Sequence, residues 1–190
     1  MVAFRIAEQK DAPILAAARQ KVWDATYRGI YPDEMIDRYD LPSFTVRDEK
    51  RIANPENKVW LVLDGAACVG YLVVGPCGFG KYKDFDFCLN SLYLLPPYQK
   101  LGLGRKAFDL TVAECRRRGL SKFFCSCSPH NHNAVGFYEH MGGVLGAKSL
   151  GHSNKAEDTV YFEFLLNTEP QMLKIKDGTL PSLSAMSHEP

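Results

Sequence analysis

The 190-residue chain lacks several features that would assign a protein to a class at once. It has no excess of one charge, since 23 Lys and Arg residues balance 22 Asp and Glu residues to a formal net charge of +1. No apolar run approaches the roughly 18 residues of a membrane-spanning helix, and Met1 to Lys10 lack the basic segment and apolar stretch of a secretory signal. We therefore expect a protein that binds neither nucleic acid nor membrane.

The six cysteines show no disulfide framework and lie mostly inside apolar segments. Small, buried, reduced cysteines of this kind are typical of cytoplasmic proteins. A chain of this length buries roughly 70% of the surface that it exposes when unfolded, so it needs neither disulfides nor a structural metal to fold. These observations predict a cytoplasmic protein without a metal, either a monomer or a homodimer.

One segment does contain residue types that bind metals, Cys125-x-Cys127-x-x-His130-x-His132. Structural zinc sites usually separate paired cysteines by about two to four residues. Cys125 and Cys127 are instead separated by a single residue on a predicted strand, where both side chains face the same side. We therefore disfavour zinc binding, and also redox chemistry, at this pair.

Hydrophobic periodicity predicts a single domain over residues 1–167, followed by a peripheral tail at 168–190. The order of elements is β-α-α-α-β-β-β-α-β-α-β-β, which predicts an α/β (α+β) protein with a mixed sheet of about six to seven strands flanked by helices. Strands are expected over 2–6, 58–63, 67–74, 85–95, 122–127, 144–147 and 159–166. Helices are expected over 11–27, from Pro32, from Ser43 to Ala53, over 102–118 and over 131–141.

The most informative segment is a turn that leads from the strand at 85–95 into the helix at 102–118. It reads Gln99-Lys100-Leu101-Gly102-Leu103-Gly104-Arg105. Glycine allows a backbone to approach a ligand closely, and the free N–H groups of a first helical turn carry partial positive charge. The turn therefore predicts a pyrophosphate site, to which Lys100 and Arg105 add charge. A glycine-rich connection without a ligand is the alternative.

A dinucleotide-binding fold is the first of two ligand hypotheses for this turn. Gly102-x-Gly104-x-x-Ala107 satisfies the pattern G-x-G-x-x-G/A. That fold requires an acidic residue about 20 positions further on, to bind a ribose hydroxyl. No Asp or Glu stands between Glu114 and Glu139, so we disfavour this hypothesis.

A coenzyme A site is the second hypothesis, and it is carried by two motifs. Gln99-x-x-Gly102-x-Gly104 resembles the [QR]-x-x-G-x-[GA] pyrophosphate loop of the GNAT superfamily of N-acetyltransferases. The segment Asn131-x-x-Ala134-x-x-Phe137-Tyr138-Glu139-x-x-Gly142 is similar to a second motif of that family, in the same order along the chain. The resemblance covers roughly residues 2–166.

The resemblance implies an acetyl-CoA-dependent N-acetyltransferase, which moves an acetyl group to a small-molecule or peptide primary amine by direct attack in a ternary complex. It implies that main-chain N–H groups near Leu94 and Leu95 hold the thioester carbonyl, and that Tyr138 protonates the departing sulfur. The residues expected at the cofactor are Leu94, Leu95, Gln99, Lys100, Leu101, Gly102, Leu103, Gly104, Arg105, Asn131, Ala134 and Tyr138. From the residues alone, Asn131 could be only a helix cap and Tyr138 only a core aromatic.

The general base is where the sequence departs from the family pattern. Many members carry Glu near the start of the central strand, but Cys88 stands at that place here. Asp86, Cys88 and Asn90 would share one face of a regular strand. Asp86 is the candidate base, with or without an intervening water, and the alternative is a plain charge at a strand end. Cys88 has no neighbouring signal for activation as a nucleophile.

The acceptor site has weaker signals. Trp23, Tyr27 and Tyr31 could supply aromatic walls, and His152 and Glu157 could supply polar contacts. The departure at the base also leaves open a different function, a non-catalytic acyl-CoA-binding or regulatory module.

Overall fold

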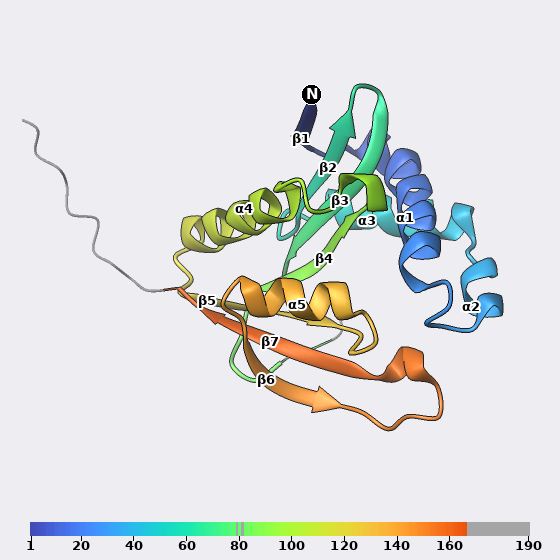
Figure 1. Cartoon of the computed structure of the whole chain (residues 1–190). Coiled ribbons are helices and arrows are strands. Elements are labelled where there is room, and N and C mark those ends of the chain that lie inside the picture. The colour runs from blue at the N-terminus through green and yellow to red at the C-terminus, as the bar shows by residue number, and fades with distance from the viewer. Residues whose placement is uncertain (79, 81, 167–190) are drawn as a thin grey trace, which may run out of the picture.

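The protein, described as a computed structural model over residues 1–78, 80 and 82–166, is built on one seven-stranded sheet (Figure 1). The expected tail at 168–190 lies outside these residues. The strands run in the order β1-β2-β3-β4-β5-β7-β6, and every described pair is antiparallel except the parallel pair β4–β5. The mixed sheet predicted from the order of elements is confirmed. Its strands are β1 (Val2–Ile6), β2 (Lys58–Asp64), β3 (Ala67–Gly75), β4 (Cys88–Leu94), β5 (Lys122–Cys127), β6 (Val144–Ser149) and β7 (Thr159–Leu165).

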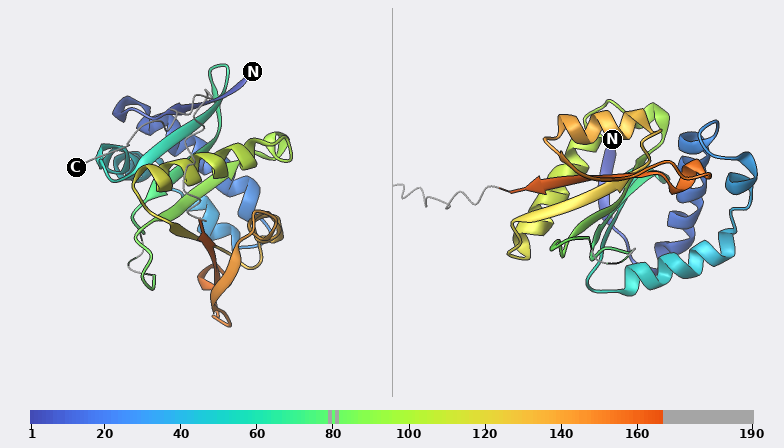
Figure 2. Two further views of the ribbon diagram at one scale, coloured as in Figure 1. Left: turned by 90° about the vertical axis from the view of Figure 1, so that its left-hand side faces the viewer. Right: turned by 90° about the horizontal axis from the view of Figure 1, so that it is seen from below.

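Helices cover both faces of the sheet (Figure 2). On one face lie α1 (Ala12–Tyr27) and α3 (Leu41–Ala53), joined through the short α2 (Asp33–Asp37). On the other face lie α4 (Leu103–Arg117) and α5 (His132–His140). Three single turns of 3₁₀-helix complete the connections: η1 (Gln9–Asp11), η2 (Pro96–Tyr98) and η3 (Lys155–Glu157).

Each face of the sheet has its own apolar core. On the α1 side, Leu15 and Val22 recur at helical spacing and pack with Leu61 and Tyr71 of the sheet. On the other side, Phe108 of α4 packs against aromatic side chains of β5, β7 and α5, namely Phe123, Phe164 and Tyr138. The two cores enclose the sheet and bury most of β3, whereas the second half of β4 is only half-buried.

Several element boundaries differ by one to three residues from those expected from the sequence, and two of these differences have a clear cause. The helix α3 begins at Leu41 rather than Ser43, because Pro42 is tolerated in a first helical turn. The central strand spans Cys88–Leu94 and not 85–95. Phe85 instead forms an isolated bridge with Tyr82, and its ring packs against Phe124. The start of β4 therefore depends on the packing of Phe85 against Phe124, which cannot be inferred from the sequence of the strand alone.

A bulge and a short pairing open the sheet between β4 and β5. The parallel pair is joined at Cys88–Phe124 and Leu89–Cys125 and separates beyond them. On the side of β3, consecutive residues Val73 and Val74 pair with Ser91 and Leu89, so Asn90 is an extra residue in β4. Such a bulge bends its strand and increases the local twist. The second half of β4 therefore turns away from β5.

An ion-pair cluster at the end of α4 makes part of the stability depend on pH. Glu114 accepts hydrogen bonds from Arg117 and Arg118, each at 2.8 Å, and these contacts lower its pKa to about 2. A carboxyl with a depressed folded pKa contributes fully above its ordinary value near 4.5, and loses that contribution as the pH falls toward 2. We expect Glu114→Gln to lower the free energy of unfolding at pH 7 and to have a much smaller effect at pH 3.

Urea unfolding of both proteins at the two pH values measures this difference. The exposed Glu139 of α5, which makes no side-chain hydrogen bond within the described residues, provides the matched variant Glu139→Gln. An equal loss for Glu114→Gln at pH 7 and pH 3 would contradict the assigned ion pairs.

Candidate active site

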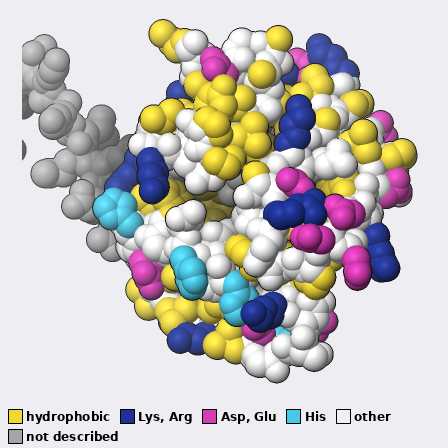
Figure 3. Space-filling model, turned by 45° about the vertical axis from the view of Figure 1, so that its right-hand side comes forward, with side chains coloured by type: hydrophobic (Ala, Val, Ile, Leu, Met, Phe, Trp, Pro, Cys, Tyr) yellow, Lys and Arg dark blue, Asp and Glu magenta, His cyan; other side chains and the backbone are white. Residues whose placement is uncertain are grey.

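A cavity of about 1030 Å³ opens where β4 and β5 separate. Figure 3 shows it as a hollow with a partly apolar floor and histidines near its rim. Its walls come from the second half of β4, the turn before α4, the turn between β5 and α5, α5 itself and the end of α1. The volume is ample for a cofactor-sized ligand.

In its second half, β4 pairs only with β3, so main-chain groups on its other side face this cavity. The N–H of Leu95 donates to Val69 O of β3 at 2.9 Å, and Tyr93 pairs with Tyr71 in the same strand. In an antiparallel pair, alternate residues face the partner strand, so Leu92 and Leu94 face the opposite way, toward the gap. The side chain of Gln99 confirms this by donating to Leu94 O at 2.9 Å.

This alternation corrects one expectation from the sequence. Leu95 was expected to hold a thioester carbonyl, but its N–H is already bound within the sheet. Leu94 lines the cavity as expected, and Leu92, two residues earlier, is a lining residue that the sequence interpretation missed. The period-two alternation of a strand was the signal that could have identified it.

The turn before α4 brings free N–H groups to the cavity. Gly102 is the N-cap of α4 and has a φ of +79°, a left-handed conformation that favours glycine. The first helical hydrogen bond runs from Lys106 N–H to Gly102 O at 3.1 Å. The N–H groups of Leu103, Gly104 and Arg105 therefore precede the helical ladder, an arrangement that can bind an anion.

Gly104 has a second role that the sequence did not indicate. A Cβ added there would lie 3.1 Å from the ring of Phe137, so the glycine allows α5 to approach α4 closely. Of the other residues expected in this loop, Gln99, Lys100 and Arg105 line the cavity. Leu101 and Leu103 do not have side chains among the lining residues, and Leu101 is exposed.

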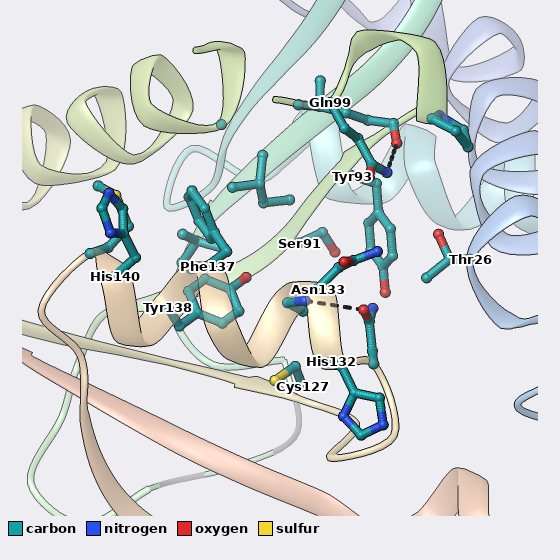
Figure 4. A pocket seen from close by; sticks show the side chains of 18 of the residues that line it. Thr26, Ser91, Tyr93, Gln99, Cys127, His132, Asn133, Phe137, Tyr138 and His140 are labelled. Atoms are coloured by element: carbon teal, nitrogen blue, oxygen red, sulfur yellow. Dashed lines mark hydrogen bonds between the residues drawn. The ribbon is translucent and has the colours of Figure 1, made fainter. Parts of the chain in front are cut away.

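The helix α5 carries the second motif along the opposite wall (Figure 4). Asn131 caps this helix, since its side-chain oxygen accepts the N–H of Ala134 at 3.1 Å, and both residues also line the cavity. Tyr138 is 5% exposed and packs against Phe137, Phe162 and Phe164, while its hydroxyl points into the cavity. Burial raises the pKa of Tyr138 well above its ordinary value, so the hydroxyl keeps its proton at neutral pH.

Several predicted acceptor and base residues lie outside the cavity lining. Asp86 is exposed and precedes β4, because the strand begins later than expected. Tyr27 lines the cavity, and its hydroxyl lies 2.7 Å from that of Tyr93. Tyr31 stacks on Tyr27 at 4.5 Å and Trp23 packs against its edge, so both support this wall from behind. His152 is exposed, and its side chain contacts Ser149 and Glu157.

Other lining residues were missed as site residues by sequence interpretation. They include Thr26, Ser91, Cys127, His130 and Asn133. The last two flank Asn131, so their position beside a recognised motif was an available signal. Among the residues that the structure describes, no group of three His, Cys, Asp or Glu side chains is arranged to hold a metal ion. In the same part of the chain, every helix is too short or too polar to cross a membrane.

The same fold occurs in solved acetyltransferase structures. PaiA N-acetyltransferase from Thermoplasma acidophilum, in complex with coenzyme A, has a TM-score of 0.68 and 16% identity over 87% of this chain and 99% of that one. Ribosomal-protein-alanine N-acetyltransferase from Brucella melitensis has a TM-score of 0.65 and 20% identity over 86% and 99%. YncA of Salmonella typhimurium, with its cofactor acetyl-CoA, has a TM-score of 0.62 and 19% identity over 89% and 96%.

These solved structures share the fold of this chain, and the chain is an acyltransferase. The family model of the acetyltransferase (GNAT) family matches residues 18–143, so the chain belongs to this family. The family resemblance expected from the two motifs is confirmed. Among curated protein sequences, none matches the chain.

Proposed function

We propose that this chain transfers an acetyl group from acetyl-CoA to a primary amine by direct attack, without an acyl-enzyme. The observation that carries the proposal is the convergence of three kinds of group on one cavity. These are the main-chain edge of β4 at Leu92 and Leu94, the free N–H groups at the start of α4, and the buried hydroxyl of Tyr138.

The residues present fit acetyl-CoA as the co-substrate. The N–H groups of Leu103, Gly104 and Arg105 would hold the pyrophosphate, and Lys100 and Arg105 would add positive charge. The amide-containing arm of the co-substrate would extend along β4 as an added strand does at a sheet edge. PaiA in complex with coenzyme A and YncA with acetyl-CoA, which share the fold, support acetyl-CoA as the co-substrate.

The chemistry follows from where these groups lie. A neutral amine attacks the thioester carbonyl carbon, and a main-chain N–H of β4 donates to the oxygen as it gains negative charge. The C–S bond then breaks, its electron pair leaves with the sulfur, and the nitrogen gives up one proton to a base or to water. Tyr138 donates its proton to that sulfur, which its raised pKa allows because the hydroxyl is protonated when the reaction begins.

Binding of acetyl-CoA is the first expected result of this proposal. At about 100 times its Kd, acetyl-CoA should raise the free energy of unfolding by about 2.7 kcal/mol. Thermal unfolding with and without the ligand measures this, with NADH and a free adenosine nucleotide as controls. The absence of stabilisation by acetyl-CoA would contradict the assigned cofactor site.

An acceptor screen then separates catalysis from binding. Free thiol release from acetyl-CoA, measured with a panel of amines, should depend on the amine added. Stabilisation by acetyl-CoA without transfer to any amine would support a non-catalytic acyl-CoA-binding module instead.

A further inference from the structure

His130, on the β5–α5 turn, lines the cavity and pairs with a carboxylate. Its Nε2 lies 3.0 Å from Oδ2 of Asp158, whose other oxygen accepts the N–H of His152 at 3.1 Å. These hydrogen bonds lower the pKa of Asp158, so the carboxylate can only accept. Nε2 of His130 therefore carries the proton, and Nδ1 keeps a lone pair that makes no hydrogen bond within the described residues.

The groups packed around His130 leave Asp158 as its principal charged partner. Tyr31, from the turn after α1, and Cys127, from β5, are neutral at pH 7 because burial raises the pKa of each, that of Cys127 to about 12. Glu157 lies beside Nδ1 of His152 at 3.8 Å, and His152 faces Asp158 through its main chain. This arrangement, a buried carboxylate that orients an imidazole, is that of a general base held in one tautomer.

The charges on the cavity wall restrict the acceptor. None of the described residues that line the cavity is Asp or Glu, whereas Lys100 and Arg105 are cations. A polyamine or another acceptor with several positive charges would therefore find no carboxylate counterion on these walls. The lining favours an acceptor with little positive charge beyond its reacting amine.

The fraction of the acceptor amine that is neutral restricts the acceptor further. A lysine-type amine with a pKa of about 10.4 is neutral in roughly one molecule in a thousand at pH 7.4. An α-amine with a pKa of about 7.8 is neutral in roughly a quarter of molecules at that pH. The neutral amine is the reacting form, and the described walls of the cavity carry no carboxylate to hold its cation, so the second class is favoured.

We propose, building on the proposed function, that His130 oriented by Asp158 is the general base, and that the acceptor is an α-amino group. The amine nitrogen forms the new C–N bond with its lone pair and passes one proton to Nδ1 of His130. The C–S electrons leave with the sulfur, which takes a proton from Tyr138. Exchange with water then returns a proton to Tyr138 and removes one from His130. Asp158 acts through His130 as a positioning residue.

Two matched acceptors and two variants test this proposal. Alanyl-glycinamide carries only an α-amine, and Nα-acetyl-lysinamide carries only a side-chain amine. We expect kcat/KM at pH 7.5 to be at least about tenfold higher for alanyl-glycinamide. His130→Gln should lower kcat/KM for that acceptor by about 10²-fold and should change the pH profile of kcat/KM.

Asp158→Asn should also change the pH profile, and it should lower kcat more than it raises KM, which loss of a structural contact alone would not do. The exposed imidazole of His152, which is not among the residues that line the cavity, provides the control variant His152→Gln. Stabilisation by acetyl-CoA should be the same in all variants, which verifies their fold and cofactor site.

The outcomes separate the two levels of the proposal. Wild-type kcat/KM and an unchanged pH profile in both His130→Gln and Asp158→Asn would overturn the role of the base, and faster transfer to Nα-acetyl-lysinamide would overturn the acceptor class. In either case the transferase function would stand. A wild-type protein that binds acetyl-CoA but acetylates neither compound, nor any other amine, would refute the proposed function, and the inference with it.

Discussion

Replacing Tyr138 by Phe should reduce kcat by about 10² to 10⁴-fold, because it removes the proton donor for the departing sulfur and little else. The ring of Tyr138 packs against Phe137, Phe162 and Phe164, and a phenylalanine ring can keep those contacts. A general acid acts in the transition state, so kcat and kcat/KM should fall together while KM for acetyl-CoA changes little.

Steady-state kinetics with an active acceptor measures this loss, and thermal unfolding with acetyl-CoA verifies the fold and the binding of the co-substrate. Tyr161 of β7 provides the matched Tyr→Phe control. It stacks on Tyr82 at 4.6 Å, away from the residues that line the cavity, so Tyr161→Phe should retain full activity. Wild-type kcat in Tyr138→Phe with every active acceptor would refute the acid role.

Replacing Asp48 by Asn should lower the free energy of unfolding by about 3–5 kcal/mol. Asp48 is fully buried in α3 and accepts from Nη2 of Arg19 at 2.8 Å and from its Nε at 3.3 Å. Arg51 donates to the same carboxylate. Asn has nearly the same shape but no charge, so the variant leaves the buried guanidinium of Arg19 without its counterion.

Urea unfolding of the two proteins measures this cost. The exposed pair of Arg28 and Asp37, joined at 2.8 Å, provides the control, because an ion pair in water contributes about 1 kcal/mol or less. Asp37→Asn should therefore change stability far less than Asp48→Asn. Equal effects of the two substitutions would show that burial of the Asp48 pair does not set its contribution.

The same ion pair supports one wall of the active site. Arg19 donates to the hydroxyl of Tyr71 at 3.0 Å, and the ring of Tyr71 lies 5.5 Å from that of Tyr93. Tyr93 in turn meets Tyr27 through their hydroxyls in the cavity. Loss of Asp48 should therefore loosen the wall formed by α1 as well as the packing of α1 on α3.

Two of the predictions that failed at the site, those for Asp86 and Leu95, depend on how the central strand pairs. The expected positions of Asp86 and Leu95 assumed a regular strand over 85–95. The bulge at Asn90 and the hydrogen bond from Leu95 to Val69 both arise from pairing with β3, which lies about 20 residues earlier in the chain. The hydrophobic periodicity of a strand predicts that the strand exists, but it does not predict at which residue pairing with the neighbouring strand begins.

The order of elements, the mixed sheet and the two cofactor motifs could be inferred from the residues alone, because each depends on spacings within one helix, strand or turn. Gly102, Asn131 and Tyr138 belong to such local patterns, and the structure places all three at the cavity. The pairing of His130 with Asp158, 28 residues apart, and of Tyr27 with Tyr93, 66 residues apart, depends on which strands meet and where they separate. These contacts form only when β4 bends away from β5 and the helices pack on both faces of the sheet. The proposed base and the acceptor wall depend on the same tertiary contacts.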